Sequence, residues 1–271
     1  MPESVRHPLL TAGPSLSEVV DRAPGPALGL FLLSGNSMIA ELCGTLPLDW
    51  VVLDAEASPM TGQDALHMLQ ALTGSSCAPV VRVSQLNQHL IEHALDLGAA
   101  GVMIPKVDTA AQAEEAAAAC RFPPEGRRGI NPVRASGYFA DVAGYLASAN
   151  ARTSCVVQIE SARALENAEA MAAVPGVDVL FLGMGDLACA LGQPGVMTGP
   201  AMDTARATVL RAARKHGKRA GIFAYAPELA RQYAEEGFEL IAFGNEIKLL
   251  REAIVSGTEA LRAPYAAVQH L

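Results

Sequence analysis

The ten residues Asp49-Trp-Val-Val-Leu-Asp-Ala-Glu-Ala-Ser58 carry the pattern that decides the fold. An apolar stretch follows Asp49, and two carboxylates, Asp54 and Glu56, come directly after it. A short, continuously apolar run is typical of a strand that is covered on both faces, as in a parallel sheet. Carboxylates at the end of such a strand indicate a site, because active sites of parallel barrels lie at the carboxyl ends of the strands.

Apolar runs of this kind recur along the chain and alternate with segments of helical spacing. The runs are Ala27–Leu33, Asp49–Ala55, Pro79–Val83, Gly101–Pro105, Ser154–Glu160, Val177–Gly183, Arg219–Ala224 and Glu239–Gly244. The helical segments are Ser37–Cys43, Gly62–Leu72, Asn87–Leu97, Thr109–Cys120, Leu165–Ala173, Ala201–His216, Pro227–Glu236 and Glu246–Gly257. This alternation predicts a single-domain α/β protein, a (β/α)8 TIM barrel. A doubly wound open sheet is the alternative, although no GxGxxG sequence follows the first run.

The predicted barrel occupies residues 27–271, with C-terminal helices, and residues 1–26 form an N-terminal extension. Within the extension, Ser15–Arg22 is a candidate helix capped by Ser15 or Ser17. One connection, Arg121–Asn150, is longer than the others. Such a connection is usually either a functional loop or an assembly surface.

The net charge of −8 excludes classes of partner. A generally acidic protein offers no surface for nucleic acid or for an anionic membrane. The five cysteines show no CxxC spacing, so neither a disulfide framework nor a zinc site is indicated. With no apolar run of about 20 residues, the sequence predicts a cytoplasmic protein.

Polar residues at the predicted strand ends are the candidates for a site. They are Asp54, Glu56, Arg82, Gln158, Glu160 and the turn Gly183-Met184-Gly185-Asp186. Glu160 and Asp186 suit a hard divalent metal such as Mg²⁺, Mn²⁺ or Co²⁺, or they cap the helices that follow them. Arg82 closes an apolar strand, where its charge needs either a substrate oxyanion or an ion pair with Asp54 or Glu56.

These residues stand within seven motifs that resemble the HpcH/HpaI aldolase family of metal-dependent 2-oxo acid aldolases. The motifs are Asp49-Trp-Val-Val-Leu-Asp-Ala-Glu, Val81-Arg82-Val, Leu97-Gly98-Ala, Ile104-Pro105-Lys-Val, Phe122-Pro-Pro-Glu-Gly-Arg-Arg-Gly129, Val157-Gln-Ile-Glu160 and Phe181-Leu-Gly-Met-Gly-Asp-Leu187. Their order and spacing match that family from Ala27 to Ile254.

The resemblance implies a role for each strand-end residue. Glu160 and Asp186 would bind the divalent metal, and Arg82 would contact the oxygen of the 2-oxo acid. Gln158 would line the pocket, and the backbone of Gly183, Met184 and Gly185 would hold the substrate carboxylate. A homo-oligomer is also implied.

One departure from the family affects the chemistry. The family's general acid/base is a histidine after Asp-x-Glu, and Ala57 stands there in this chain. Loss of such a group typically costs about 10²–10⁴-fold in rate. A second departure is Met184, where the family usually has proline. Asp96, on the helix after the third strand, matches the aspartate that pairs with the histidine across a subunit boundary.

Because Ala57 cannot act as an acid or base, we expect this chain to catalyse a different reaction and not the family's usual reaction at a lower rate. The first hypothesis is the family's citrate synthase of siderophore biosynthesis, which joins oxaloacetate to acetyl-CoA, with Glu56 and Asp96 as candidate bases. The alternative is an aldolase that cleaves or forms 4-hydroxy-2-oxo acids of the 2-keto-3-deoxy sugar acid type, with pyruvate as product. A non-catalytic protein that binds 2-oxo acids is the third.

Overall fold

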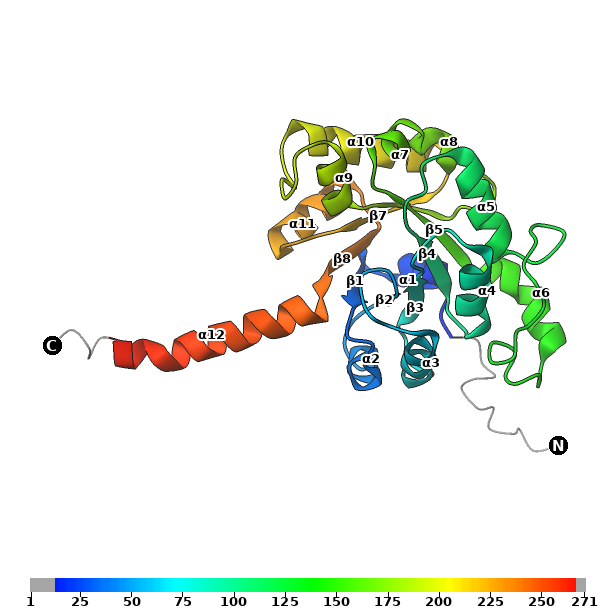
Figure 1. The fold of residues 1–271 in the computed structure, drawn as a ribbon, viewed down its shortest axis with the longest axis horizontal. Coiled ribbons are helices and arrows are strands. Elements are labelled where there is room, and N and C mark those ends of the chain that lie inside the picture. The colour runs from blue at the N-terminus through cyan, green and yellow to red at the C-terminus, as the bar shows by residue number, and fades with distance from the viewer. Residues whose placement is uncertain (1–12, 267–271) are drawn as a thin grey trace.

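The computed structural model describes residues 13–266 and contains a closed barrel of eight parallel strands in chain order (Figure 1). The strands are β1 (Ala27–Leu32), β2 (Trp50–Asp54), β3 (Ala78–Arg82), β4 (Gly101–Ile104), β5 (Ser154–Ile159), β6 (Val179–Leu182), β7 (Arg219–Phe223) and β8 (Leu240–Asn245). The barrel closes because β1 pairs with both β2 and β8. The predicted TIM barrel is confirmed, and the doubly wound alternative is wrong.

Helices surround the barrel and follow each strand. They are α1 (Leu16–Arg22), α2 (Ser37–Gly44), α3 (Gly62–Ala71), α4 (Gln88–Asp96), α5 (Ala110–Cys120), α6 (Val142–Arg152), α7 (Ala162–Glu166), α8 (Ala168–Ala172), α9 (Met184–Ala190), α10 (Pro200–Lys215), α11 (Pro227–Glu236) and α12 (Glu246–Ala266).

Three helical predictions need correction. The long connection contains α6, which was not predicted. The predicted helix Leu165–Ala173 is two short helices, because Asn167 interrupts it and donates its side-chain amide to the carbonyl oxygens of Asp108 and Arg163. The last helix runs past the predicted end at Gly257 to Ala266.

Side chains that alternate along each strand divide the apolar core into two regions. Trp50 and Val52 of β2 belong to the cluster inside the barrel, whereas Val51 and Leu53 belong to the cluster beneath the helices. This is the period of two that a strand imposes. At β1, Gly29 leaves room for the Trp50 ring, because a Cβ there would lie 2.3 Å from Cε2 of that ring.

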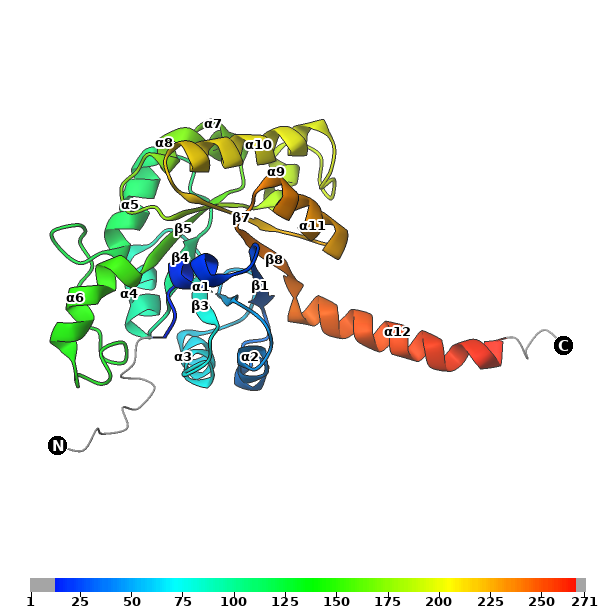
Figure 2. The ribbon, with the colours of Figure 1, turned by 180° about the vertical axis from the view of Figure 1, so that it is seen from behind.

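Helix α1 covers the amino ends of the strands, in the centre of the barrel as seen in Figure 2. Its residues Leu16, Val19 and Val20 join the interior cluster. Ser15 caps α1 and forms a capping box with Glu18, as the sequence predicts. This end of the barrel is therefore closed by apolar packing, and the open mouth lies at the other end.

Helix α12 extends away from the barrel instead of packing along it (Figures 1 and 2). No helix within residues 13–266 is long and apolar enough to cross a bilayer. The predicted division into residues 1–26 and 27–271 stays a prediction, and residues 1–12 and 267–271 of it lie outside the described part.

Candidate active site at the mouth of the barrel

Strand periodicity carries polar residues into the mouth. Trp50 and Val52 face the interior, so Asp54, two residues further on, faces it as well. Val80 and Arg82 on β3 repeat this relation, and Asp54 and Arg82 are partners in the strand register. The apolar strands therefore end in charges that point to a common centre.

A cavity of about 270 Å³ occupies this mouth. The predicted site residues that line it are Asp54, Ala57, Arg82, Gln158, Glu160, Gly183, Met184, Gly185 and Asp186. Phe31, Phe181, Phe223, Tyr225 and Asn245 also contribute to its wall. The structure thus brings the predicted residues of β2, β3, β5 and β6 to one place, while their chemical roles stay predictions.

On the β2 and β3 side the charges are paired. Arg82 donates from Nε to Asp54 Oδ1 at 2.9 Å and from Nη2 to Asp54 Oδ2 at 2.5 Å, a two-pronged contact to a fully buried carboxylate. Arg82 Nη1 lies 3.0 Å from Glu56 Oε2. The predicted ion pair forms with both acidic residues. Two of the five guanidinium N–H groups are not used by these contacts.

On the β5 side, Glu160 is buried, and in the described part of the chain no cationic side chain forms an ion pair with it. Its Oε1 accepts the backbone N–H of Lys106 at 2.7 Å, and its Oε2 accepts Nε2 of Gln158 at 3.1 Å. Burial, together with repulsion by Glu56 and Asp186, raises the pKa of Glu160 to about 7, although the Lys106 N–H and the charge of Arg82 act to lower it. Because the side-chain Oε1 of Gln158 is buried without a partner, this wall has unused acceptor capacity.

The turn after β6 brings backbone close to Glu160. A Cβ at Gly183 would lie 2.7 Å from Glu160 Oε2, so a side chain there would displace the carboxylate. Helix α9 starts after Gly183 with no side-chain cap, so the N–H groups of its first turn lack intrahelical partners, whereas the N–H of Gly183 donates to the Ile159 carbonyl oxygen at 3.0 Å. Such groups are suited to an anionic ligand.

Helix capping does not explain the two carboxylates. Ser161, and not Glu160, caps α7 through a bond to the Ala164 N–H. Asp186 lies inside the first turn of α9 and not before it. The capping interpretation of both residues is wrong.

The donor set of the mouth fits a divalent cation. In the described part of the chain no three His, Cys, Asp or Glu side chains converge as a ready-made metal site. Glu160 and Asp186 nevertheless lie at the same cavity, and their repulsion would be relieved by a cation. Two hard oxygen ligands with solvent or substrate completing the shell match Mg²⁺ or Mn²⁺.

Two residues at the mouth were not predicted as site residues. Lys106 follows β4 with a φ of 55°, which is rare for a residue with a side chain, and its Nζ lies 3.6 Å from Glu56 Oε1. Tyr225 follows β7 and lines the cavity. Position after a strand was the available signal for both, but neither residue type indicates a role by itself.

Two predicted site residues do not line this cavity: Glu56, which contacts Arg82 at its edge, and Asp96. Asp96 lies at the end of α4, and its Oδ1 accepts Nη2 of Arg128 at 2.7 Å. It lines a different cavity, of about 370 Å³, together with His89 and His93. Within a single chain, Asp96 is therefore separate from Arg82 and Glu160.

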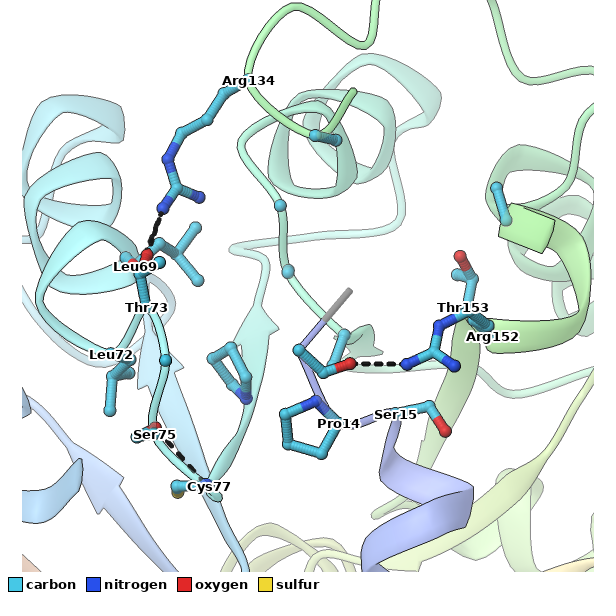
Figure 3. A pocket seen from close by; sticks show the side chains of 18 of the residues that line it. Pro14, Ser15, Leu69, Leu72, Thr73, Ser75, Cys77, Arg134, Arg152 and Thr153 are labelled. Carbon is cyan, nitrogen blue, oxygen red and sulfur yellow. Dashed lines mark hydrogen bonds between the residues drawn. The ribbon is translucent and has the colours of Figure 1, made fainter. Parts of the chain in front are cut away.

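A further cavity of about 350 Å³ lies between the N-terminal segment, α3 and α6 (Figure 3). Its two arginines are already engaged. Arg134 donates to the carbonyl oxygen of Leu69 at 3.1 Å, and Arg152 donates to that of Gly13 at 2.5 Å. This cavity lacks the strand-end carboxylates, so the mouth is the better candidate.

Comparisons with known proteins identify the family of the chain. The family model "HpcH/HpaI aldolase/citrate lyase" matches residues 27–253. A hydroxypyruvate/pyruvate aldolase from Chromohalobacter salexigens is 43% identical, covering 79% of this chain and 85% of that protein. A 5-keto-4-deoxy-D-glucarate aldolase from Klebsiella pneumoniae is 38% identical, covering 87% and 92% respectively.

Solved structures show the same fold. An HpcH/HpaI aldolase/citrate lyase family protein from Burkholderia cenocepacia is 36% identical, with a TM-score of 0.86 over 91% of this chain and 98% of the other. A citrate synthase named SbnG has a TM-score of 0.84 but is 20% identical, over 93% and 99%. At that identity the likeness shows the fold alone. The comparisons therefore favour the aldolase alternative over the citrate synthase hypothesis.

Proposed function

This chain belongs to the HpcH/HpaI aldolase/citrate lyase family, and we propose that it is a metal-dependent aldolase that forms or cleaves 4-hydroxy-2-oxo acids, with pyruvate as donor or product. The observation that carries the proposal is the buried carboxylate Glu160, which shares one cavity with Asp186 and Arg82 and forms no ion pair with a cationic side chain of the described residues. The aldolase names of relatives at 38–43% identity support the reaction class.

Glu160 and Asp186 would hold the divalent metal, Mg²⁺ or another hard ion. When bound, such a metal supplies Lewis-acid stabilisation of negative charge on substrate oxygen atoms. The carboxylates hold the ion at the β5 and β6 side of the cavity, next to the Gly183 turn.

Arg82 and the turn would fix the 2-oxo acid. The N–H groups of Arg82 that Asp54 and Glu56 do not occupy are available to the 2-oxo oxygen. The backbone N–H groups of Met184 and Gly185 would bind the substrate carboxylate, whereas the N–H of Gly183 already donates to the Ile159 carbonyl oxygen. Asp54 is a positioning residue, because it holds the guanidinium by two hydrogen bonds.

Glu56 is the candidate base. It adjoins Ala57 in sequence and lies between Arg82 and Lys106. The pKa of Glu56 is raised, mainly by burial. A carboxylate with a raised pKa is a stronger base and so accepts a proton more readily. In this role it takes the proton that leaves the methyl carbon of pyruvate.

A direct assay tests the reaction. Purified protein with Mg²⁺ or Mn²⁺ should release pyruvate from 5-keto-4-deoxy-D-glucarate, measured by coupled reduction of pyruvate to lactate. Ala57→His should raise kcat by up to about 10²-fold if it restores acid/base catalysis. Release of free CoA from oxaloacetate and acetyl-CoA, with no pyruvate in the first assay, would favour the citrate synthase instead.

The proposal extends to a homo-oligomer. The projecting α12 exposes Ile247, Leu250, Ile254 and Leu261 at helical spacing. An apolar stripe of this kind is stable in water only when another surface covers it. Sedimentation analysis of the full chain tests this, and a monomer at micromolar concentration would contradict it. Acetyl-CoA as a partner and a cytoplasmic location stay predictions.

A further inference from the structure

The cavity contains one hydroxyl group for which the proposed function has no role. Tyr225 follows β7, lines the cavity and is 37% exposed. Among the other polar residues of the wall, Asp54 is bound to Arg82, and Glu160 and Asp186 are assigned to the cation. Ala57 faces the same cavity and carries no polar atom. Tyr225 is therefore an available O–H donor in a site that lacks the usual imidazole.

A continuous set of contacts fixes the position of the Tyr225 ring. The ring packs on Phe223 at 4.7 Å between centroids, and Phe223 packs edge-on against Phe31 at 5.3 Å. The guanidinium carbon of Arg82 lies 5.1 Å from the centroid of Phe31. Lys248 of α12 donates to the Tyr225 carbonyl oxygen at 2.7 Å, which anchors the backbone.

The phenol oxygen lies over the substrate-binding turn. A Cβ on Gly185 would be 2.8 Å from it, so glycine at this position allows the hydroxyl to approach the backbone. A tyrosine hydroxyl, with an ordinary pKa of about 10, is protonated and able to donate at neutral pH.

We infer that the Tyr225 hydroxyl donates a hydrogen bond to the oxygen on C4 of the 4-hydroxy-2-oxo acid. Ala57, at the position of the family's histidine, has no polar atom to make this contact. The inference rests on the proposed function. In condensation a C3–H bond of pyruvate breaks and its proton goes to the base, while C3 bonds to the aldehyde carbon. The aldehyde oxygen gains negative charge as its C=O π bond breaks and then takes up the proton held by the base, directly or through solvent, so the proton count balances. Tyr225 stabilises that charge as it develops.

The test separates the acceptor step, in which C3 of pyruvate bonds to the aldehyde, from the donor step, in which pyruvate loses a methyl proton. Tyr225→Phe removes the hydroxyl and keeps the ring contacts. With pyruvate, glycolaldehyde and Mg²⁺, kcat for condensation should fall about 10²–10³-fold, the usual cost of one oxyanion donor. The rate at which the pyruvate methyl protons exchange in D2O, followed by NMR, should stay within about threefold of wild type. The KM for pyruvate should stay within the same range, since neither quantity involves the aldehyde.

Tyr233→Phe is the matched control. Tyr233 is buried on α11, and its hydroxyl has no hydrogen-bond partner, so its loss should leave kcat and the melting temperature nearly unchanged. Ala57→His in the Tyr225→Phe background should recover at least about tenfold of kcat, because an imidazole could reach the same oxygen.

Two outcomes overturn the inference in distinguishable ways. Condensation by Tyr225→Phe within threefold of wild type, or a parallel fall in proton exchange, would remove Tyr225 from the acceptor step while leaving the aldolase proposal intact. A wild-type protein that neither exchanges pyruvate protons nor condenses would overturn the proposed function together with this inference.

Discussion

The two sides of the cavity differ in how their charges are balanced. On the β2 and β3 side, the guanidinium of Arg82 contacts Asp54 and Glu56. On the β5 and β6 side, Glu160 accepts only N–H groups of the backbone and of an amide. A buried carboxylate without a counter-ion is costly, and it either takes up a proton or binds a cation. The first side is therefore balanced by ion pairs within the protein, and the second is the side at which we propose that a divalent cation binds.

The largest expected effect comes from removing charge on the unbalanced side. Glu160→Gln keeps the size of the side chain but loses a metal ligand, so kcat/KM for pyruvate release should fall by about 10⁴-fold, equivalent to about 5 kcal/mol. Glu169→Gln is the control, because Glu169 is an exposed partner of Lys215. Equal activity of the two variants would show that the charge of Glu160 is not needed for pyruvate release.

A substitution on the balanced side should lower the free energy of unfolding. Arg82→Leu leaves the fully buried Asp54 without a counter-charge and should lower the free energy of unfolding by about 3–5 kcal/mol. Urea denaturation measures this loss. Arg219→Leu removes more exposed pairs with Asp21 and Glu239 and should cost below about 1 kcal/mol. A similar loss in both variants would show that Arg82 is not a structural anchor.

The pH dependence of the metal-free protein distinguishes the two sides further. Because the pKa of Glu160 is raised to about 7 in the folded state, the folded protein holds a proton that the unfolded chain releases near pH 4.5. The free energy of unfolding should therefore fall by about 3 kcal/mol as pH rises from 4.5 to 7. Chemical denaturation at several pH values measures it, and the decrease should be absent from Glu160→Gln. The same decrease in that variant would assign it to other groups.

The smallest effect is expected at the rim. Lys106 has a side chain that is 73% exposed and 3.6 Å from Glu56, so Lys106→Met should change the free energy of unfolding by less than about 1 kcal/mol. Its backbone N–H to Glu160 remains in the variant. A KM for pyruvate that changes more than about fivefold would instead give the ammonium a part in donor binding.

The barrel was predictable because each strand is short, apolar and covered on both faces. All eight predicted runs agree with the observed strands to within two residues. Helix α6 was not predictable in the same way, since Gly144, Ser148 and Asn150 interrupt its pattern and one of its residues, Ala149, is buried. Tertiary contacts, such as the bonds between Asn150 and the backbone of Phe122, hold it in place.

Site residues at the mouth could be predicted where a charged residue ends an apolar strand. Arg82 and Glu160 could be recognised because charges are rare next to such runs. Tyr225 could not, because a tyrosine in a loop carries no positional signal until the cavity and the Gly185 turn are seen. The missing imidazole at Ala57 pointed first to a change of reaction, whereas the structure supplies another donor within the same cavity.

Titration of Mn²⁺ into the protein, followed by electron paramagnetic resonance, tests the difference between the two sides most directly. We expect one ion per chain in wild type and in Glu56→Gln, with no binding in Glu160→Gln. Loss of the ion in Glu56→Gln, or its retention in Glu160→Gln, would contradict it.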